Sequence, residues 1–213
     1  MWNNDAGKVD EQGVHRLFQL VFQEENKMLR QAVAADLDHI EEGYQEHFLH
    51  EREHGAFTVF QEGVYPTIED AKRALLAGAL FVCEEGDILA GSIIADTRQP
   101  DEYGEINWPS RAADEKVMVI HLVIVRPGMA GKGIGSSLVN YALEIAKQRS
   151  CEAVRLDTGS QNIPAVSLYR KLGFELAGTT SMKVGGLIAH DRHLFFEKRL
   201  YYNAKSSAGA SAR

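Results

Sequence analysis

The segment Val117–Val125 (VMVIHLVIV) restricts the fold of this chain more than any other. It is apolar except for His121 and rich in β-branched residues, which predicts a strand buried on both faces. A glycine-rich loop follows, and a second strand is expected over residues 153–157. Between loop and strand an amphipathic helix is marked by apolar residues at helical spacing: Ile134, Leu138, Ala142 and Ile145. A strand–helix–strand order requires a parallel pair with a right-handed crossover.

Further strands and helices are predicted around this unit. Strands are expected over residues 28–33, 80–83, 88–95, 174–183 and 187–200. Helices are expected over residues 14–22, 36–48, 67–77 and 162–172. Because a turn separates the strands 80–83 and 88–95, these two should form an antiparallel hairpin. The class is therefore α/β with a mixed sheet.

Charge and composition exclude several classes of protein. The 213 residues carry 23 Lys and Arg against 30 Asp and Glu, a formal net charge of −7, so no broad basic face for nucleic acid is expected. No apolar run is long enough to span a membrane, and the N-terminus does not read as a signal peptide. Cys83 and Cys151 lie far apart in strand-like runs, which indicates buried, reduced thiols and a cytoplasmic location.

The glycine-rich loop, residues 128–136 (GMAGKGIGS), is a candidate anion site. Three glycines on alternate positions leave backbone N–H groups open at the positive end of the following helix. A Walker A loop is excluded because Gly133, and not Ser or Thr, follows Lys132. A dinucleotide fingerprint matches in part: Asp157 lies where its acidic residue is expected, but Ser136 replaces its third glycine. The alternative to an anion site is that the glycines only allow a tight turn and the loop binds no ligand.

Read with its flanks, VIVRPGMAGKGIGSSLV resembles the acyl-CoA-binding motif of the GNAT N-acetyltransferase superfamily, Arg/Gln-x-x-Gly-x-Gly/Ala. Downstream, SQNIPAVSLYRKLGF is similar to that superfamily's second signature, in which Asn162 precedes a helix carrying Tyr169. One residue departs from the pattern. Ala130 stands in place of the Arg or Gln that often helps to hold the pyrophosphate.

The resemblance covers residues 28–200. It implies a twisted, mostly antiparallel sheet whose central parallel strands splay apart, flanked by helices. Residues 1–27 would then form an N-terminal extension with a short helix. Residues 201–213, with the low-complexity sequence AKSSAGASAR, would form a disordered tail.

Acetyl-CoA is the cosubstrate that the resemblance implies. Its pantetheine amides would pair with the exposed backbone of Val123, Ile124 and Val125. Its pyrophosphate suits the backbone N–H groups of the loop. The predicted binding set beyond the strand is Gly131, Lys132, Gly133, Ile134, Gly135, Ser136 and Asn162.

Attack of an amine on a thioester needs a neutral amine, donors for the carbonyl oxygen and a proton for the departing thiolate. Tyr169 is the candidate acid, because a phenol stays protonated at neutral pH; the alternative is a tyrosine that only packs its ring. Two residues are candidates for the general base, directly or through water. The alternative for His121 is a buried histidine whose ring nitrogens are hydrogen-bonded within the core. The alternative for Asp157 is a residue that caps the following turn.

The predicted function is transfer of an acetyl group from acetyl-CoA to a primary amine of a small molecule or peptide. Transfer would be direct, in a ternary complex, because no cysteine lies near the loop. A non-catalytic CoA- or nucleotide-sensing domain is the alternative. Homodimers are common in this family, and nothing in the sequence requires one. Residues that either line an acceptor pocket or belong to the core are Tyr44, Phe60, Tyr65 and Trp108.

Residues 50–54 (HEREH) match the zinc-hydrolase pattern H-E-x-x-H. Arg52 and Glu53 occupy middle positions that are apolar in buried zinc helices, and Gly55 follows directly. A solvated, charged helix end is therefore the better interpretation, and no metal is expected. His190 and His193 are expected on the surface or within a strand.

Overall fold

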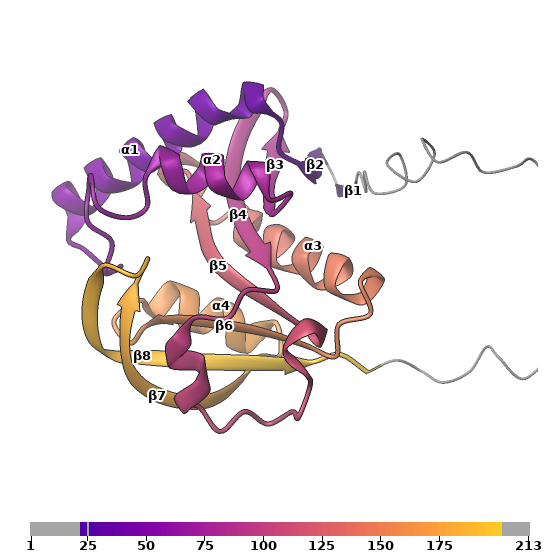
Figure 1. Ribbon diagram of the computed structural model, residues 1–213. Helices are drawn as coiled ribbons and strands as arrows, with labels where there is room; N and C mark the ends of the chain where they lie inside the picture. Colours follow the sequence, from indigo (N-terminus) through magenta and orange to yellow (C-terminus); the bar gives the residue numbers. More distant parts are fainter. Residues whose placement is uncertain (1–21, 25, 202–213) are drawn as a thin grey trace, which may run out of the picture.

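A mixed β-sheet runs through the computed structural model, which describes residues 22–24 and 26–201. Its strands lie in the order β1-β2-β3-β4-β5-β6-β8-β7 (Figure 1). The only parallel neighbours in this described sheet are β5 and β6, which confirms the expected mixed, mostly antiparallel arrangement. The strands are β1 (Phe22–Glu24), β2 (Lys27–Gln31), β3 (Leu80–Glu85), β4 (Ile88–Asp96), β5 (Val117–Val125), β6 (Ala153–Gly159), β7 (Glu175–Val184) and β8 (Ile188–Arg199).

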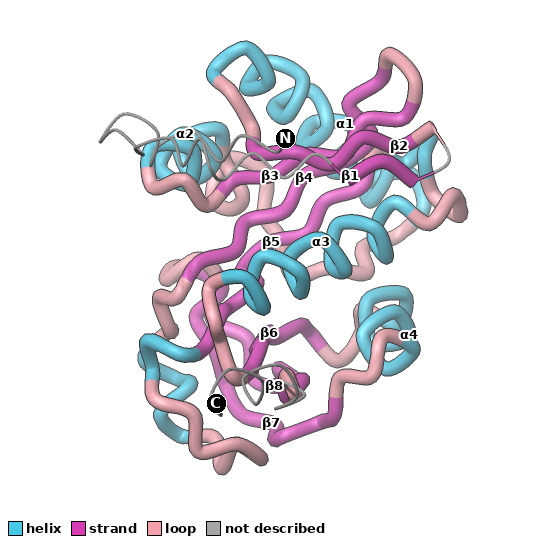
Figure 2. The backbone as a smooth tube through the Cα atoms, turned by 90° about the vertical axis from the view of Figure 1, so that its right-hand side faces the viewer, coloured by secondary structure: helices cyan, strands magenta, loops and turns pink. Residues whose placement is uncertain are grey.

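Four α-helices in the described residues cover the two faces of the sheet (Figures 1 and 2). They are α1 (Leu37–His54), α2 (Ile68–Leu76), α3 (Ile134–Gln148) and α4 (Ile163–Lys171). Strand β3 shows the division of the core. Leu80 and Val82 pack with α1 and α2, whereas Phe81 and Cys83 pack with α3 and α4 on the other face. This alternation is the two-residue period of a strand between two helical layers.

The long segment between β4 and β5 covers the rest of the sheet face on which α1 and α2 pack. Its Tyr103 and Trp108 contact Phe195 of β8, with ring centroids 5.5 and 6.3 Å away. Trp108 is thus half-buried against the core and does not line the main cleft described below. Tyr44 and Tyr65 are likewise buried in the core beside α1 and α2.

The predicted elements agree with the observed ones within a few residues, with one clear difference in length. The helix expected to end at Phe48 continues to His54 and ends at Gly55, whose φ is +94°. The last turns carry mostly polar residues, so the apolar stripe stops before the helix does. The capping box of α2 is confirmed, since the Thr67 N–H donates to Asp70 Oδ2 at 2.7 Å. The helix predicted over residues 14–22 lies outside the described residues, except for Phe22, which begins β1.

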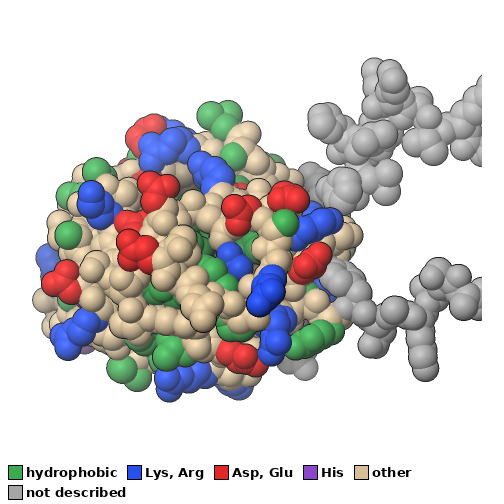
Figure 3. Space-filling view, turned by 60° about the horizontal axis from the view of Figure 1, so that its bottom comes forward, with side chains coloured by type: hydrophobic (Ala, Val, Ile, Leu, Met, Phe, Trp, Pro, Cys, Tyr) green, Lys and Arg blue, Asp and Glu red, His purple; other side chains and the backbone are tan. Residues whose placement is uncertain are grey.

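Within residues 22–24 and 26–201, no helix combines the length and the apolar character needed to cross a membrane. On the face shown in Figure 3, Lys and Arg side chains lie among Asp and Glu side chains. That face therefore carries charges of both signs close together.

Candidate active site

The main cleft of the described structure opens where β5 and β6 separate. Pairing between the two strands ends at Ile120 and Leu156, although β5 continues to Val125 and β6 to Gly159. The cleft has a volume of about 630 Å³. It is lined by β5, the glycine loop, α4, the end of β6 and the region following α1. The predicted splay is thus present, and the backbone of residues 121–125 has no β6 partner.

A β-bulge at His121 accompanies this separation. In the β4–β5 ladder Ile94 pairs with Leu122 and Ala95 with Ile120, so His121 is the extra residue. The bulge changes the alternation of β5: Ile120 packs on the α3 face, whereas Leu122 packs on the α1 face. Bulges bend a strand and interrupt its pairing. This one therefore directs β5 away from β6 at the point where the cleft begins.

The glycine loop forms one wall of the cleft and leads into α3. Gly131 and Gly133 both have φ of +79°, a region that favours glycine. The N–H groups of Ile134, Gly135 and Ser136 belong to the first helical turn and have no acceptor within the helix. All of these residues line the cleft. Backbone donors and the helix dipole make this wall suitable for a phosphate.

Lys132 is the one predicted binding residue that does not line the cleft. Its Nζ lies 3.6 Å from Oε1 of Glu85, on β3. A role for its side chain at the pyrophosphate is therefore unsupported by its position. The other residues of the predicted set line the cleft: Val123, Ile124, Val125, Gly131, Gly133, Ile134, Gly135, Ser136 and Asn162.

Helix α4 brings Asn162 and Tyr169 to the cleft. Asn162 caps the helix, because its Oδ1 accepts from the Ala165 N–H at 3.2 Å. Tyr169 is 6% exposed and packs its ring against Phe174 and Phe196, with centroids 6.0 and 6.2 Å away. Burial, and then the nearby Asp157 carboxylate, raise the pKa of Tyr169 well above its ordinary value. Its hydroxyl therefore stays protonated at any physiological pH.

Asp157, near the end of β6, has a strongly perturbed pKa. Its side chain is 13% exposed, and burial raises its pKa to about 6, although a hydrogen bond from the Tyr103 hydroxyl at 2.9 Å opposes the increase. On its other side, Nε2 of His193 lies 3.5 Å from Asp157 Oδ2. Such a carboxylate is ionised at neutral pH and still basic enough to accept a proton.

His121 also faces the cleft, but it already has a carboxylate partner. Its Nε2 lies 2.8 Å from Oδ1 of Asp96 on β4. Burial would raise the pKa of Asp96, but hydrogen bonds from His121 and Arg98 outweigh it and hold that pKa well below the usual range. Asp96 and Tyr103 could not be predicted from the sequence, because neither belongs to a motif and both reach the site from other parts of the chain.

The structure confirms the expectation for His190 and His193 and corrects one for the H-E-x-x-H segment. His190 and His193 lie on β8, as expected; His193 is 2% exposed, with its Nδ1 2.8 Å from Nδ1 of His190. Burial lowers its pKa to about 4. Glu51 is buried, not solvated; Arg52 and Glu53 are exposed as expected. Among the described residues no group of three or more His, Cys, Asp or Glu is placed to hold a metal ion.

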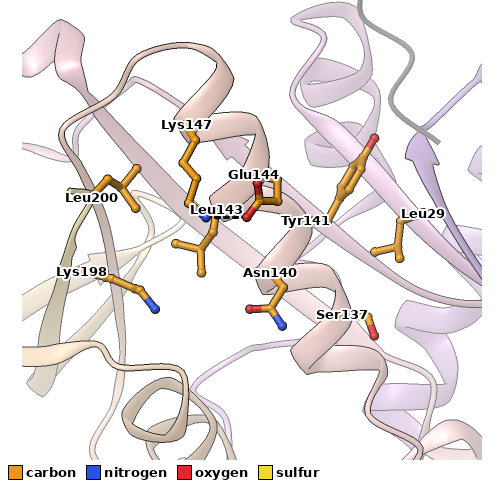
Figure 4. Close-up of a pocket in the computed structure, with 9 residues that line it drawn as sticks. All are labelled: Leu29, Ser137, Asn140, Tyr141, Leu143, Glu144, Lys147, Lys198 and Leu200. Carbon is orange, nitrogen blue, oxygen red and sulfur yellow. Dashed lines mark hydrogen bonds and ion pairs between the residues drawn. The ribbon is translucent and has the colours of Figure 1, made fainter. Parts of the chain in front are cut away.

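A second, smaller pocket of about 370 Å³ lies beside α3 (Figure 4). Most of its lining belongs to α3, and it is completed by Leu29 of β2, Lys198 of β8 and Leu200, which follows β8. Of the described residues that line it, none is a candidate from the sequence. Apart from Lys132, the candidate residues of the predicted site therefore all line the main cleft.

Comparisons with known proteins agree with this geometry. The model of the acetyltransferase (GNAT) family matches residues 37–174. An uncharacterized N-acetyltransferase from Methanocaldococcus jannaschii is 37% identical over 95 residues, 45% of this chain and 38% of the relative. A streptothricin acetyltransferase from Streptomyces lavendulae is 31% identical over 87 residues, 41% of this chain and 46% of the relative. The chain thus spans less than half the length of these relatives.

Solved structures show the same fold. A GNAT-family acetyltransferase from Streptococcus agalactiae aligns with a TM-score of 0.70 at 17% identity, over 86% of this chain and all of that one. A protein from Salmonella typhimurium, solved with its cofactor acetyl-CoA, aligns with a TM-score of 0.59 at 20% identity, over 87% of this chain and all of that one. The family match includes the splayed strands, the glycine loop and α4, and the chain belongs to the acetyltransferase (GNAT) family.

Proposed function

We propose that this protein transfers an acetyl group from acetyl-CoA to a primary amine by direct attack in a ternary complex. The observation that carries the proposal is one cleft in which the glycine loop, the separated edge of β5, Tyr169 and Asp157 all take part. Family membership and the acetyl-CoA bound to the Salmonella typhimurium neighbour support the choice of cosubstrate.

Acetyl-CoA fits the donors of this cleft. Its pyrophosphate would lie on the N–H groups at the start of α3, with the Ser136 hydroxyl beside them. The pantetheine amides would pair with the backbone of residues 123–125, which has no β6 partner. Ala130 lines the cleft where related motifs carry Arg or Gln. The phosphates would therefore depend on backbone donors more than on a charged side chain.

The chemical step needs one proton acceptor and one proton donor. Asp157 would take a proton from the acceptor's ammonium group, so that a neutral nitrogen attacks the thioester carbonyl carbon. As the C–S bond breaks, the Tyr169 hydroxyl would protonate the departing CoA thiolate, and the second proton lost by the attacking nitrogen would return, through water, to the Tyr169 oxygen. The amide and free CoA are the products. His121 remains a second candidate base, through water, because it faces the same cleft.

Calorimetric titration with acetyl-CoA tests the proposal, with NAD and ATP as controls. The expected result is one acetyl-CoA per chain and CoA release when an amine is added. Gly135→Glu places a carboxylate in the first turn of α3 and should abolish binding. Gly128→Glu is the matched control, since Gly128 is exposed and outside the cleft.

Each outcome has a definite meaning. Intact binding in the Gly135→Glu variant would refute the phosphate assignment. Binding of acetyl-CoA without turnover would favour a CoA-sensing domain. This is the second candidate function because Ala130 stands where the family motif carries Arg or Gln. The cytoplasmic location and the choice between monomer and homodimer stay predictions from the sequence.

A further inference from the structure

One wall of the cleft is aromatic and is separate from the glycine loop. It consists of His47 on α1 with Phe57 and Phe60 from the loop that follows α1, all of which line the cleft. The His47 ring lies 5.7 Å from that of Phe57 and 5.9 Å from that of Phe60, centroid to centroid. Both phenylalanines are half-buried, so their rings present apolar surface to whatever occupies the cleft. We call these three residues the aromatic wall.

The aromatic wall carries no charge at neutral pH. His47 is 6% exposed, and burial lowers its pKa below 6.5, more than the neighbouring Glu51 raises it. Among the described residues that line the whole cleft, Asp157 is the one carboxylate, and there is no Lys or Arg. Outside the glycine loop, which the pyrophosphate would occupy, the described lining offers a second ammonium group or a carboxylate no Lys, Arg or further carboxylate as a partner, and burying such a charge there is unfavourable.

The aromatic wall is held in place by Glu51. Its Oε1 accepts from the Phe57 N–H at 3.1 Å and from the Thr58 N–H at 2.7 Å, and its Oε2 accepts from the Thr58 hydroxyl at 2.9 Å. Both oxygens of the Glu51 carboxylate thus accept hydrogen bonds from the loop, and Glu51 does not line the cleft. The aromatic surface is therefore built before any ligand binds, which lowers the entropy cost of docking on it.

We infer that the acceptor is a small molecule with a single primary amine on an aromatic or aliphatic body. This inference rests on the proposed function. The ammonium group lies against Asp157, where it loses its proton, and the uncharged body lies on the aromatic wall. Diamines and free amino acids are poor acceptors, because the cleft offers their second charge no partner among the described residues.

Two matched pairs of amines test the inference, each with acetyl-CoA. Hexylamine and 1,5-diaminopentane have nearly the same shape and differ by a methyl against an ammonium group. 2-Phenylethylamine and phenylalanine differ by one carboxylate. We expect kcat/KM to be at least about tenfold higher for the first member of each pair. Equal or higher kcat/KM for 1,5-diaminopentane or phenylalanine overturns the inference.

The acetyl-CoA titration separates the two levels of failure. If acetyl-CoA binds and neither hexylamine nor 2-phenylethylamine is acetylated, the inferred acceptor class is wrong and the cosubstrate assignment stands. If acetyl-CoA does not bind, the proposed function is wrong, and the inference is overturned with it.

Two variants test the aromatic wall itself. Phe57→Ala should lower kcat/KM for 2-phenylethylamine about tenfold and leave the Kd of acetyl-CoA unchanged. Leu49→Ala is the control, because Leu49 is 47% exposed on α1 and outside the cleft. A loss of activity equal in both variants, or none in Phe57→Ala, overturns the role of the wall.

His50→Glu tests the charge argument in the opposite direction. His50 lines the cleft from α1, whereas His54, one turn later, is exposed and does not. A second carboxylate at position 50 should raise kcat/KM for 1,5-diaminopentane relative to hexylamine about tenfold. The control His54→Glu should leave this ratio unchanged. No change in the ratio for His50→Glu overturns the charge argument.

Discussion

Asp157→Asn should make the protein more stable at neutral pH and abolish acetyl transfer. The folded protein holds this carboxyl with a pKa of about 6, against an ordinary 3.8, because it is buried. Keeping it ionised above pH 6 therefore costs about 3 kcal/mol of folding free energy. Asparagine removes that charge, and its Oδ1 can still accept from the Tyr103 hydroxyl. The variant should gain up to about 3 kcal/mol over the wild type near pH 7.5.

The pH dependence gives the decisive signature of this effect. Between pH 3.8 and 6 the folded state keeps the Asp157 proton and the unfolded state has lost it, so wild-type stability falls as pH rises. Below this window Asp157 is neutral in both states, and above it ionised in both. The stability difference between Asp157→Asn and wild type should thus grow by about 1.4 kcal/mol per pH unit within the window and then level off.

Urea unfolding of both proteins at about pH 4.5, 6 and 7.5 measures the difference. Asp87→Asn, at an exposed turn, controls for the loss of a carboxylate in general. A difference that does not change with pH would refute the argument from burial. For the wild type, kcat/KM should fall tenfold per pH unit below about pH 6, as the base becomes protonated. Full activity in Asp157→Asn would remove this residue from the mechanism and leave His121 as the base.

Three further substitutions have definite expected outcomes. Tyr169→Phe should lower kcat by about 10²–10⁴-fold with an unchanged Kd for acetyl-CoA, measured by single turnover and calorimetry; unchanged turnover would contradict the acid role. Ala130→Arg should tighten acetyl-CoA binding about tenfold by adding a charged donor, and an unchanged Kd would mean that the backbone donors suffice. Glu51→Ala should lower the free energy of unfolding by about 2–4 kcal/mol, against little change for the exposed Glu53→Ala.

Local patterns predicted most of the fold because they needed no knowledge of distant residues. The apolar run of β5, the capping box at Thr67 and the glycines at 131 and 133 each carry their structural reason in neighbouring positions. Contacts between distant segments could not be predicted in this way. Tyr103 reaches Asp157 across 54 residues, and Asp96 reaches His121 across 25.

The segment HEREH shows how a motif can be present without its usual chemistry. Three hydrogen bonds from the following loop occupy the carboxylate of Glu51, and the exposed His54 lies one turn beyond His50. Charge patterning predicted an exposed helix end, and this is correct for Arg52 and Glu53. It failed for Glu51, because a buried carboxylate with three donors and a solvated one have the same sequence signature.

The bulge at His121 connects the fold with the candidate chemistry. An apolar strand buried on both faces has no polar alternation, so a one-residue insertion in its ladder leaves no trace in the sequence. The pairing with β6 ends at Ile120, so the following backbone groups of β5 that point away from β4 have no strand partner. Such groups are costly when they are dry and unpaired. A ligand with amide groups, such as the pantetheine arm of acetyl-CoA, can supply the hydrogen bonds that β6 does not, so we expect the interruption that weakens the sheet to give the cleft its affinity for such a ligand.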